Sequence, residues 1–134
     1  MMDNNLLKVA LAQITPVWLN KEKTLQKIEK SILEAAKESC ELIVFGEALL
    51  PGYPFWIALT NGAEWDSKTQ KEIYAHYVRN SVTIEKGELD SVCKLAKEHN
   101  ISIYLGIMER AQNRGGHSVY CSLVYINQEG KIKS

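Results

Sequence analysis

Hydrophobic and polar positions in the first third of the chain follow the order strand, helix, strand. Residues 7–14 (LKVALAQI) are a short β-rich run that ends before Pro16, because proline lacks an amide hydrogen and disfavours helix in the residue before it. From Asn20, a residue type that favours N-caps, apolar residues recur at helical spacing through residue 36, which predicts an amphipathic helix of about five turns. Residues 42–45 (LIVF) are continuously apolar, as in a strand covered on both faces. This order predicts a right-handed crossover between parallel strands.

The middle of the chain predicts a loop followed by two helices. Residues 46–56 (GEALLPGYPFW) contain two glycines and two prolines, which favour a shaped loop at the end of a strand. Asp66 or Ser67 can cap a helix that runs to about Asn80, and residues 88–99 repeat the helical pattern. We expect both helices to pack on the sheet.

Two further β-rich runs close the chain. Residues 102–108 and 118–126 have strand character, and NRGG at 113–116 supplies glycines for a loop between adjacent strands. Residues 128–134 (QEGKIKS) begin with a turn signal, so we expect the sequence to be cut before a further element. The whole pattern predicts one α/β domain over residues 1–134.

Composition and charge exclude several classes of protein. The chain of 134 residues is 46% hydrophobic, and sixteen Lys and Arg balance sixteen Asp and Glu, which excludes the broad positive field of a nucleic-acid or anionic-membrane binder. Its apolar runs fall short of the roughly 18 to 20 residues of a spanning helix, and the start MMDNNLLK lacks the basic and apolar order of a signal peptide. We therefore expect a small-molecule partner, with neither nucleic acid nor membrane.

The cysteines and histidines predict neither disulfides nor a metal site. Cys40, Cys93 and Cys121 cannot all pair within the chain and show no CxxC spacing, which fits a reducing cytoplasm. We expect each to fill the core as a small apolar side chain. The three histidines have no metal-ligand spacing, and the chain has no GxGxxG motif, so no metal or cofactor is expected.

Glu47 is the strongest candidate for chemistry. It lies two positions beyond the apolar strand 42–45, in the loop that also holds Tyr53, Phe55 and Trp56. A carboxylate partly desolvated by these aromatic rings would be suited to general base catalysis. A solvated or helix-capping glutamate fits the same position, and spacing alone leaves both open.

Four segments resemble the nitrilase (carbon-nitrogen hydrolase) superfamily. LIVFGEALLPGYPFW at 42–56 is similar to the block in which that family places a catalytic glutamate before a Pro-Gly-Tyr-Pro turn. VALAQITPVW at 9–18, NSV at 80–82, and IYLGIMER with GHSVYCSLVYINQEGK over 103–131 resemble further family segments in the same order. The resemblance implies the N-terminal half of an α-β-β-α layered sandwich, in the nitrilase-like branch.

The resemblance also implies a mechanism. In that family glutamate deprotonates a cysteine, the thiolate attacks a nitrile or amide carbon, and lysine stabilises the adduct. Only the glutamate maps onto this chain, at Glu47; the family's lysine and cysteine blocks lie beyond Ser134. The resemblance therefore implies a hydrolase converting nitrile to carboxylate and ammonia, inactive as this portion alone.

Substrate contacts, assembly and an alternative function complete the expectations. We expect Tyr53 and Trp56 to bind the nitrile or amide substrate, although an aromatic plug or subunit contact is equally compatible with the loop. The resemblance suggests a homo-oligomer. A non-catalytic α/β binding or assembly module on the same scaffold is the alternative, and the gene's continuation past Ser134 would distinguish the two.

Overall fold

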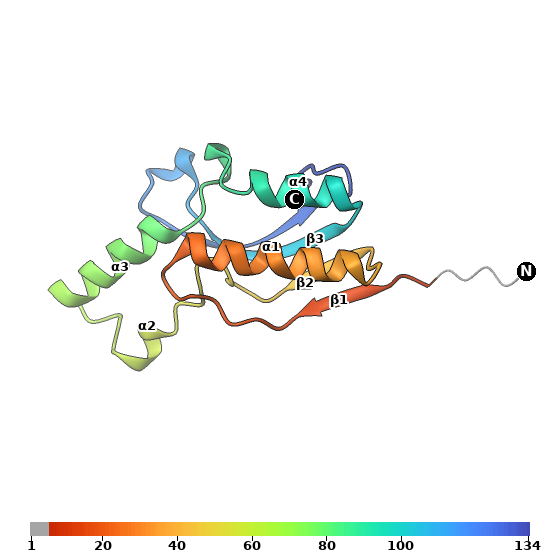
Figure 1. Ribbon diagram of the computed structural model, residues 1–134. Coiled ribbons are helices and arrows are strands. Elements are labelled where there is room, and N and C mark those ends of the chain that lie inside the picture. Colours follow the sequence, from red (N-terminus) through yellow and green to blue (C-terminus); the bar gives the residue numbers. More distant parts are fainter. Residues whose placement is uncertain (1–5) are drawn as a thin grey trace, which may run out of the picture.

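The sheet at the centre of the molecule has four strands in the order β1-β2-β3-β4 (Figure 1). In this computed structural model, which describes residues 6–134, β1–β3 are parallel and β4 is antiparallel to β3. The elements are β1 (Val9–Ala12), α1 (Lys21–Lys37), β2 (Leu42–Phe45), α2 (Trp56–Leu59), α3 (Lys68–Asn80), α4 (Asp90–His99), β3 (Ser102–Glu109) and β4 (Tyr120–Ile126), with 3-10 turns at Ile84–Lys86 and Gln112–Arg114. The predicted strand-helix-strand unit and the α/β class are confirmed.

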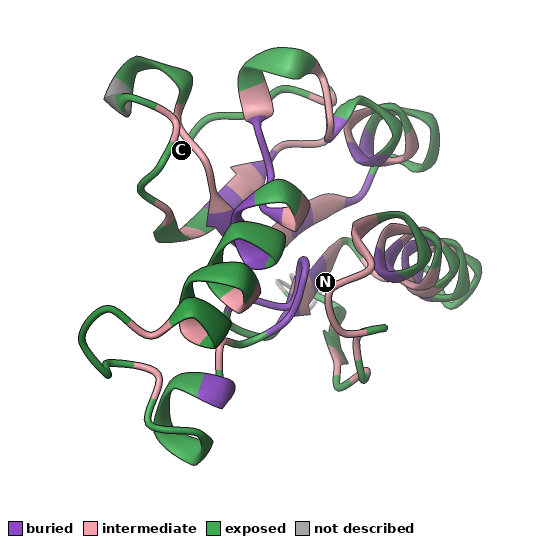
Figure 2. Ribbon diagram, turned by 90° about the vertical axis from the view of Figure 1, so that its left-hand side faces the viewer, coloured by how far each residue is buried: buried purple, intermediate pink, exposed green. Residues whose placement is uncertain are grey.

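Helices α1 and α4 lie side by side on one face of the sheet (Figures 1 and 2). The Asn20 side chain accepts a hydrogen bond from the Lys23 amide and caps α1, as its sequence position predicts. Ile28 and Ile32 of α1 are fully buried against the strands. Burial of each such side chain stabilises the fold by about 1.5–3 kcal/mol, so this layer anchors the parallel strands.

The opposite face of the sheet is largely uncovered within residues 6–134. Leu11 is 78% exposed and Leu123 is 60% exposed. Leu42 and Val44 are only half-buried, while their neighbours in β2 are buried. The continuous apolar run 42–45 predicted a strand covered on both faces. Within residues 6–134 only one face of the sheet is covered, because α1 and α4 lie on the same side.

Helix α3 departs from the expected packing on the sheet. It projects beyond the carboxyl ends of the parallel strands (Figure 1). Ser67 caps it as predicted, yet its buried residues are Tyr77 and Val78, both near its end, and Tyr74 is 41% exposed. The prediction that α3 packs on the sheet is wrong, because only the last turns of α3 carry a buried surface.

The described part of the chain, residues 6–134, includes no helix that combines the length and the apolar character needed to cross a membrane.

Candidate active site at the end of strand β2

The backbone after β2 forms a bulge that presents Glu47. Val44 pairs with Tyr104 of β3, and Leu50 next pairs with Ile107. The chain therefore advances six residues after Val44 while β3 advances three after Tyr104. Residues 46–49 leave the plane of the sheet as a result. The chain is held again at Leu50, whose amide donates to the Gly106 carbonyl at 3.3 Å and whose carbonyl accepts from the Met108 amide at 2.9 Å. Glu47 is therefore fixed on both sides along the chain.

The bulge passes directly over Gly106 in β3. A Cβ atom at Gly106 would lie 2.2 Å from the Gly46 carbonyl oxygen and 2.9 Å from the Glu47 Cα. Both distances are shorter than real Cβ contacts, so only glycine fits. Glycine inside a strand pattern commonly marks such a close backbone approach, and this signal could have drawn attention to Gly106 in the sequence.

Glu47 itself is exposed in this chain. The desolvation expected from its aromatic neighbours is therefore absent within residues 6–134. One partner lies close by: the Cys121 thiol donates a hydrogen bond to Glu47 Oε1 across 3.4 Å.

The sequence predicted that Cys121 fills the core, and this prediction is wrong. Cys121 is an exposed residue of β4. Partial desolvation of its sulfur, followed by the hydrogen bond and charge of Glu47, raises the pKa of the Cys121 thiol above its usual range. A raised pKa keeps the thiol protonated at neutral pH, whereas a nucleophilic cysteine needs the thiolate. Cys40 and Cys93 are half-buried, also as free thiols.

An apolar hollow of about 850 Å³ lies beside Glu47. Its walls come from the ends of β1 and β2 and from the loop after Glu47, with Trp18, Tyr53 and Phe55 as aromatic members. Trp18 donates from Nε1 to the Tyr53 carbonyl at 3.1 Å, and its ring lies 4.9 Å from that of Phe55. Tyr53 thus lies in the hollow with Glu47, and sequence reasoning missed Trp18, which is 35 residues away along the chain.

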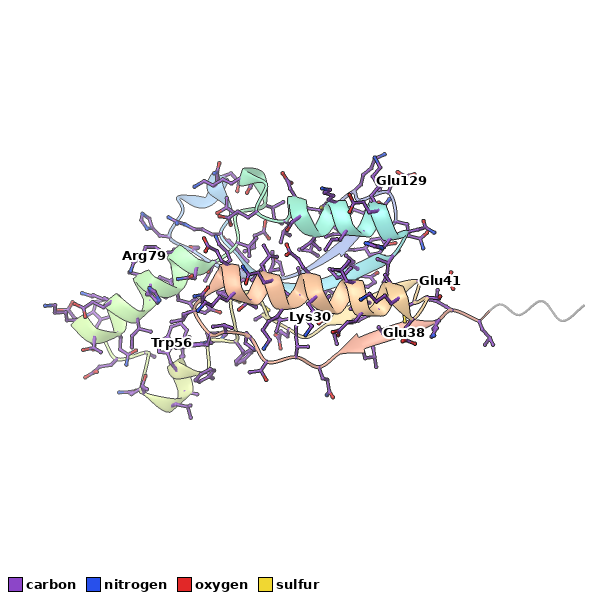
Figure 3. All side chains as sticks on the ribbon, in the orientation of Figure 1. Lys30, Glu38, Glu41, Trp56, Arg79 and Glu129 are labelled. Carbon is purple, nitrogen blue, oxygen red and sulfur yellow. The ribbon has the colours of Figure 1, made fainter. Side chains whose placement is uncertain are left out.

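Trp56 lies outside the residues that line this hollow. Its side chain is 5% exposed and packs against Tyr77, with ring centroids 4.8 Å apart, at the α2–α3 end of the molecule (Figure 3). The hydroxyl of Tyr77 donates to the Gly52 carbonyl at 2.7 Å, and burial raises the pKa of Tyr77 well above its usual range. Trp56 and Tyr77 therefore stabilise the loop after Glu47 from its buried side.

The described residues place one exposed carboxylate beside an apolar hollow. The exposed carboxylate of Glu47 can accept a proton from a group placed in the hollow. Lys131 forms an ion pair with Glu129 at 2.9 Å, and Glu129 lies at the opposite end of the molecule from Trp56 (Figure 3), so Lys131 has no place in this site. Over residues 6–134 no three His, Cys, Asp or Glu side chains gather as metal ligands.

Comparison with solved structures defines the class of fold. An amidase from Nesterenkonia sp. AN1 in complex with butyramide superimposes with a TM-score of 0.62 at 16% identity, over 96% of this chain and 41% of the amidase. The NitFhit protein of C. elegans gives a TM-score of 0.64 at 16% identity, over 96% of this chain and 28% of that protein. Both likenesses concern the fold, and they confirm the predicted nitrilase-type architecture.

The family follows from sequence. The carbon-nitrogen hydrolase family model matches residues 8–134, and the chain belongs to that family. It is 35% identical over 126 residues to an arylacetonitrilase of Aspergillus oryzae, covering 94% of this chain and 34% of that enzyme. It is 34% identical over 128 residues to an aliphatic nitrilase of Rhodococcus rhodochrous, covering 96% of this chain and 33% of that enzyme. The chain thus spans about a third of the length of these relatives.

Proposed function

We propose that these residues form the N-terminal part of a hydrolase that converts a nitrile to a carboxylate and ammonia, with Glu47 as general base. The observation that carries the proposal is the bulge over Gly106, which presents the Glu47 carboxylate beside an apolar hollow. Membership of the carbon-nitrogen hydrolase family supports the reaction class. The nitrile is favoured as substrate because the curated relatives include an arylacetonitrilase and an aliphatic nitrilase.

In the proposed reaction Glu47 takes the proton of a cysteine thiol, and the thiolate adds to the nitrile carbon. The nitrogen gains protons, water adds to the carbon, and ammonia leaves to give a thioester. Glu47 then removes a proton from a second water molecule, which cleaves the thioester to carboxylate and free thiol. A lysine stabilises charge on the adduct. The nucleophile and the lysine come from outside these 134 residues, so the chain alone is inactive.

The surroundings of Glu47 assign the remaining roles. Tyr53 and the neighbouring Phe55 form an aromatic wall for the substrate, because both line the hollow that holds Glu47. Trp56 supports that wall through Trp18, whose ring centroid lies 6.0 Å from that of Trp56. The protein functions in the cytoplasm, whose reducing conditions keep the exposed Cys121 thiol free. It assembles with copies of itself, and the exposed Leu59 and Trp65 provide apolar surface for such contacts.

Glu47→Gln in the full-length protein tests the proposal. The substitution preserves side-chain size but removes the base, so ammonia release from a panel of aryl and aliphatic nitriles and amides should fall by about a hundred- to ten-thousand-fold. The melting temperature should stay within a few degrees. Glu34→Gln is the matched control, because Glu34 is exposed and its 3.8 Å ion pair with Lys30 contributes little.

The alternatives have distinct outcomes. Near-normal hydrolysis by Glu47→Gln would remove Glu47 from the mechanism. A wild-type protein that releases no ammonia from any member of the panel would instead indicate a non-catalytic module.

A further inference from the structure

Two positions on the strands beside the bulge lie against Glu47 without belonging to the proposed catalytic set. We infer that Gly106 of β3 and Cys121 of β4 are positioning residues, which together hold the Glu47 carboxylate in its working place. This inference rests on the proposed function, because it assigns a purpose to the placement of the proposed base.

Gly106 sets the height of the bulge above the sheet. The backbone of residues 46–48 lies so close that a Cβ at position 106 would also come within 2.9 Å of the Ala48 amide nitrogen. The three nearest atoms belong to the backbone, which cannot rotate aside as a long side chain can. An alanine at position 106 therefore lifts the segment that carries Glu47, while the hydrogen bonds at Leu50 hold its far end.

Cys121 sets the direction of the carboxylate. In β4 it pairs with Met108, and Leu123 pairs with Gly106, so Cys121 and the missing side chain of Gly106 belong to the same face of the sheet. The thiol reaches Glu47 Oε1 from that face at 3.4 Å. Its raised pKa leaves the proton on sulfur at neutral pH, where it can be donated to the carboxylate.

The two positions predict different losses of activity in the full-length protein. Gly106→Ala should lower kcat for nitrile hydrolysis about a hundredfold, since a displacement of about 1 Å has that effect on a catalytic group. Cys121→Ala should lower kcat about tenfold and leave KM unchanged, because the Glu47 carboxylate loses the donor that fixes its direction. Cys121→Ser retains a donor and should return kcat to within about threefold of wild type.

Two control variants separate positioning from general disturbance. Cys93→Ala removes a half-buried thiol from α4 and should leave kcat and KM unchanged. Gly115→Ala adds a methyl group where no atom lies within 4 Å, although at a left-handed φ of 74°, and should affect stability alone. Circular dichroism and melting temperatures establish which variants fold.

The outcomes distinguish this inference from the proposed function. Glu47→Gln is assayed in parallel: if it hydrolyses nitriles normally, the proposed function fails and the inference with it. If Glu47→Gln is inactive while Gly106→Ala and Cys121→Ala keep the wild-type kcat, the inference alone is overturned. Should Gly106→Ala not fold, the alanine and serine variants of Cys121 decide, and a serine variant as impaired as alanine would overturn the hydrogen-bonding role.

Discussion

Two leucines on opposite faces of the same sheet offer a quantitative test of the proposed architecture. Leu105 of β3 is fully buried beneath the helices, whereas Leu123 of β4 is 60% exposed on the uncovered face. Complete burial of a leucine side chain stabilises a protein by about 1.5–3 kcal/mol. From these residues alone, Leu123→Ala should lower the free energy of unfolding by about 1 kcal/mol at most, and Leu105→Ala by about 2–5 kcal/mol.

In the full-length protein the two substitutions should become equivalent. A layered sandwich places a second sheet on the uncovered face, so Leu123→Ala should then also cost about 2–5 kcal/mol, measured by urea denaturation with circular dichroism. If Leu123→Ala still costs less than about 1 kcal/mol while Leu105→Ala costs more than 2, the reasoning about a second layer is refuted.

The 134-residue chain alone provides the complementary measurement. Its uncovered apolar face should make it self-associate in size-exclusion chromatography. Leu11→Lys combined with Leu123→Lys should reduce that association, because both side chains are exposed on this face. A compact, soluble wild-type monomer with cooperative unfolding would contradict the expectation.

Three further predictions concern the loop and its support. Tyr77→Phe removes the donor of the buried 2.7 Å hydrogen bond to the Gly52 carbonyl. In urea denaturation it should lower the free energy of unfolding of the full-length protein by about 1–3 kcal/mol. An unchanged free energy would mean that the Gly52 carbonyl finds another donor. In the full-length protein Tyr53→Ala should mainly change which nitriles are hydrolysed, whereas Trp56→Ala should mainly lower the melting temperature. If the two variants change substrate preference and melting temperature equally, these separate roles are refuted. Desolvation and Glu47 raise the pKa of the Cys121 thiol, so iodoacetamide should label Cys121 at pH 8 more slowly than an unstructured cysteine. Glu47→Gln should accelerate this labelling. An unchanged rate would argue against the contact between Cys121 and Glu47.

Local patterns in the sequence were sufficient for most of the elements. Residues 42–45 form β2 as predicted, and Asn20 and Ser67 cap their helices. These features depend on residues within a few positions of one another, so periodicity and capping chemistry reveal them. The short helix α2 was not predicted, because it lies in a segment rich in glycine and proline.

The sequence was least informative where packing joins distant segments. Trp56 and Tyr53 are neighbours in sequence with similar aromatic character, yet only Tyr53 lines the hollow with Glu47, because Trp56 is buried against Tyr77 of α3. Cys121 lies in an apolar strand and was expected in the core, but its side chain belongs to the face that these residues leave uncovered. Alternation along a strand cannot tell which face will be covered.

The central claim is that Glu47 acts as a general base, and chemical rescue tests it most directly. Glu47→Ala in the full-length protein removes the carboxylate but leaves space beside the hollow, into which a small carboxylate can diffuse. We expect nitrile hydrolysis to fall by at least about a hundredfold and to recover as formate or acetate is added. Glu34→Ala should neither lose activity nor respond to added carboxylate. Hydrolysis by Glu47→Ala at nearly the wild-type rate, without added carboxylate, would contradict the account.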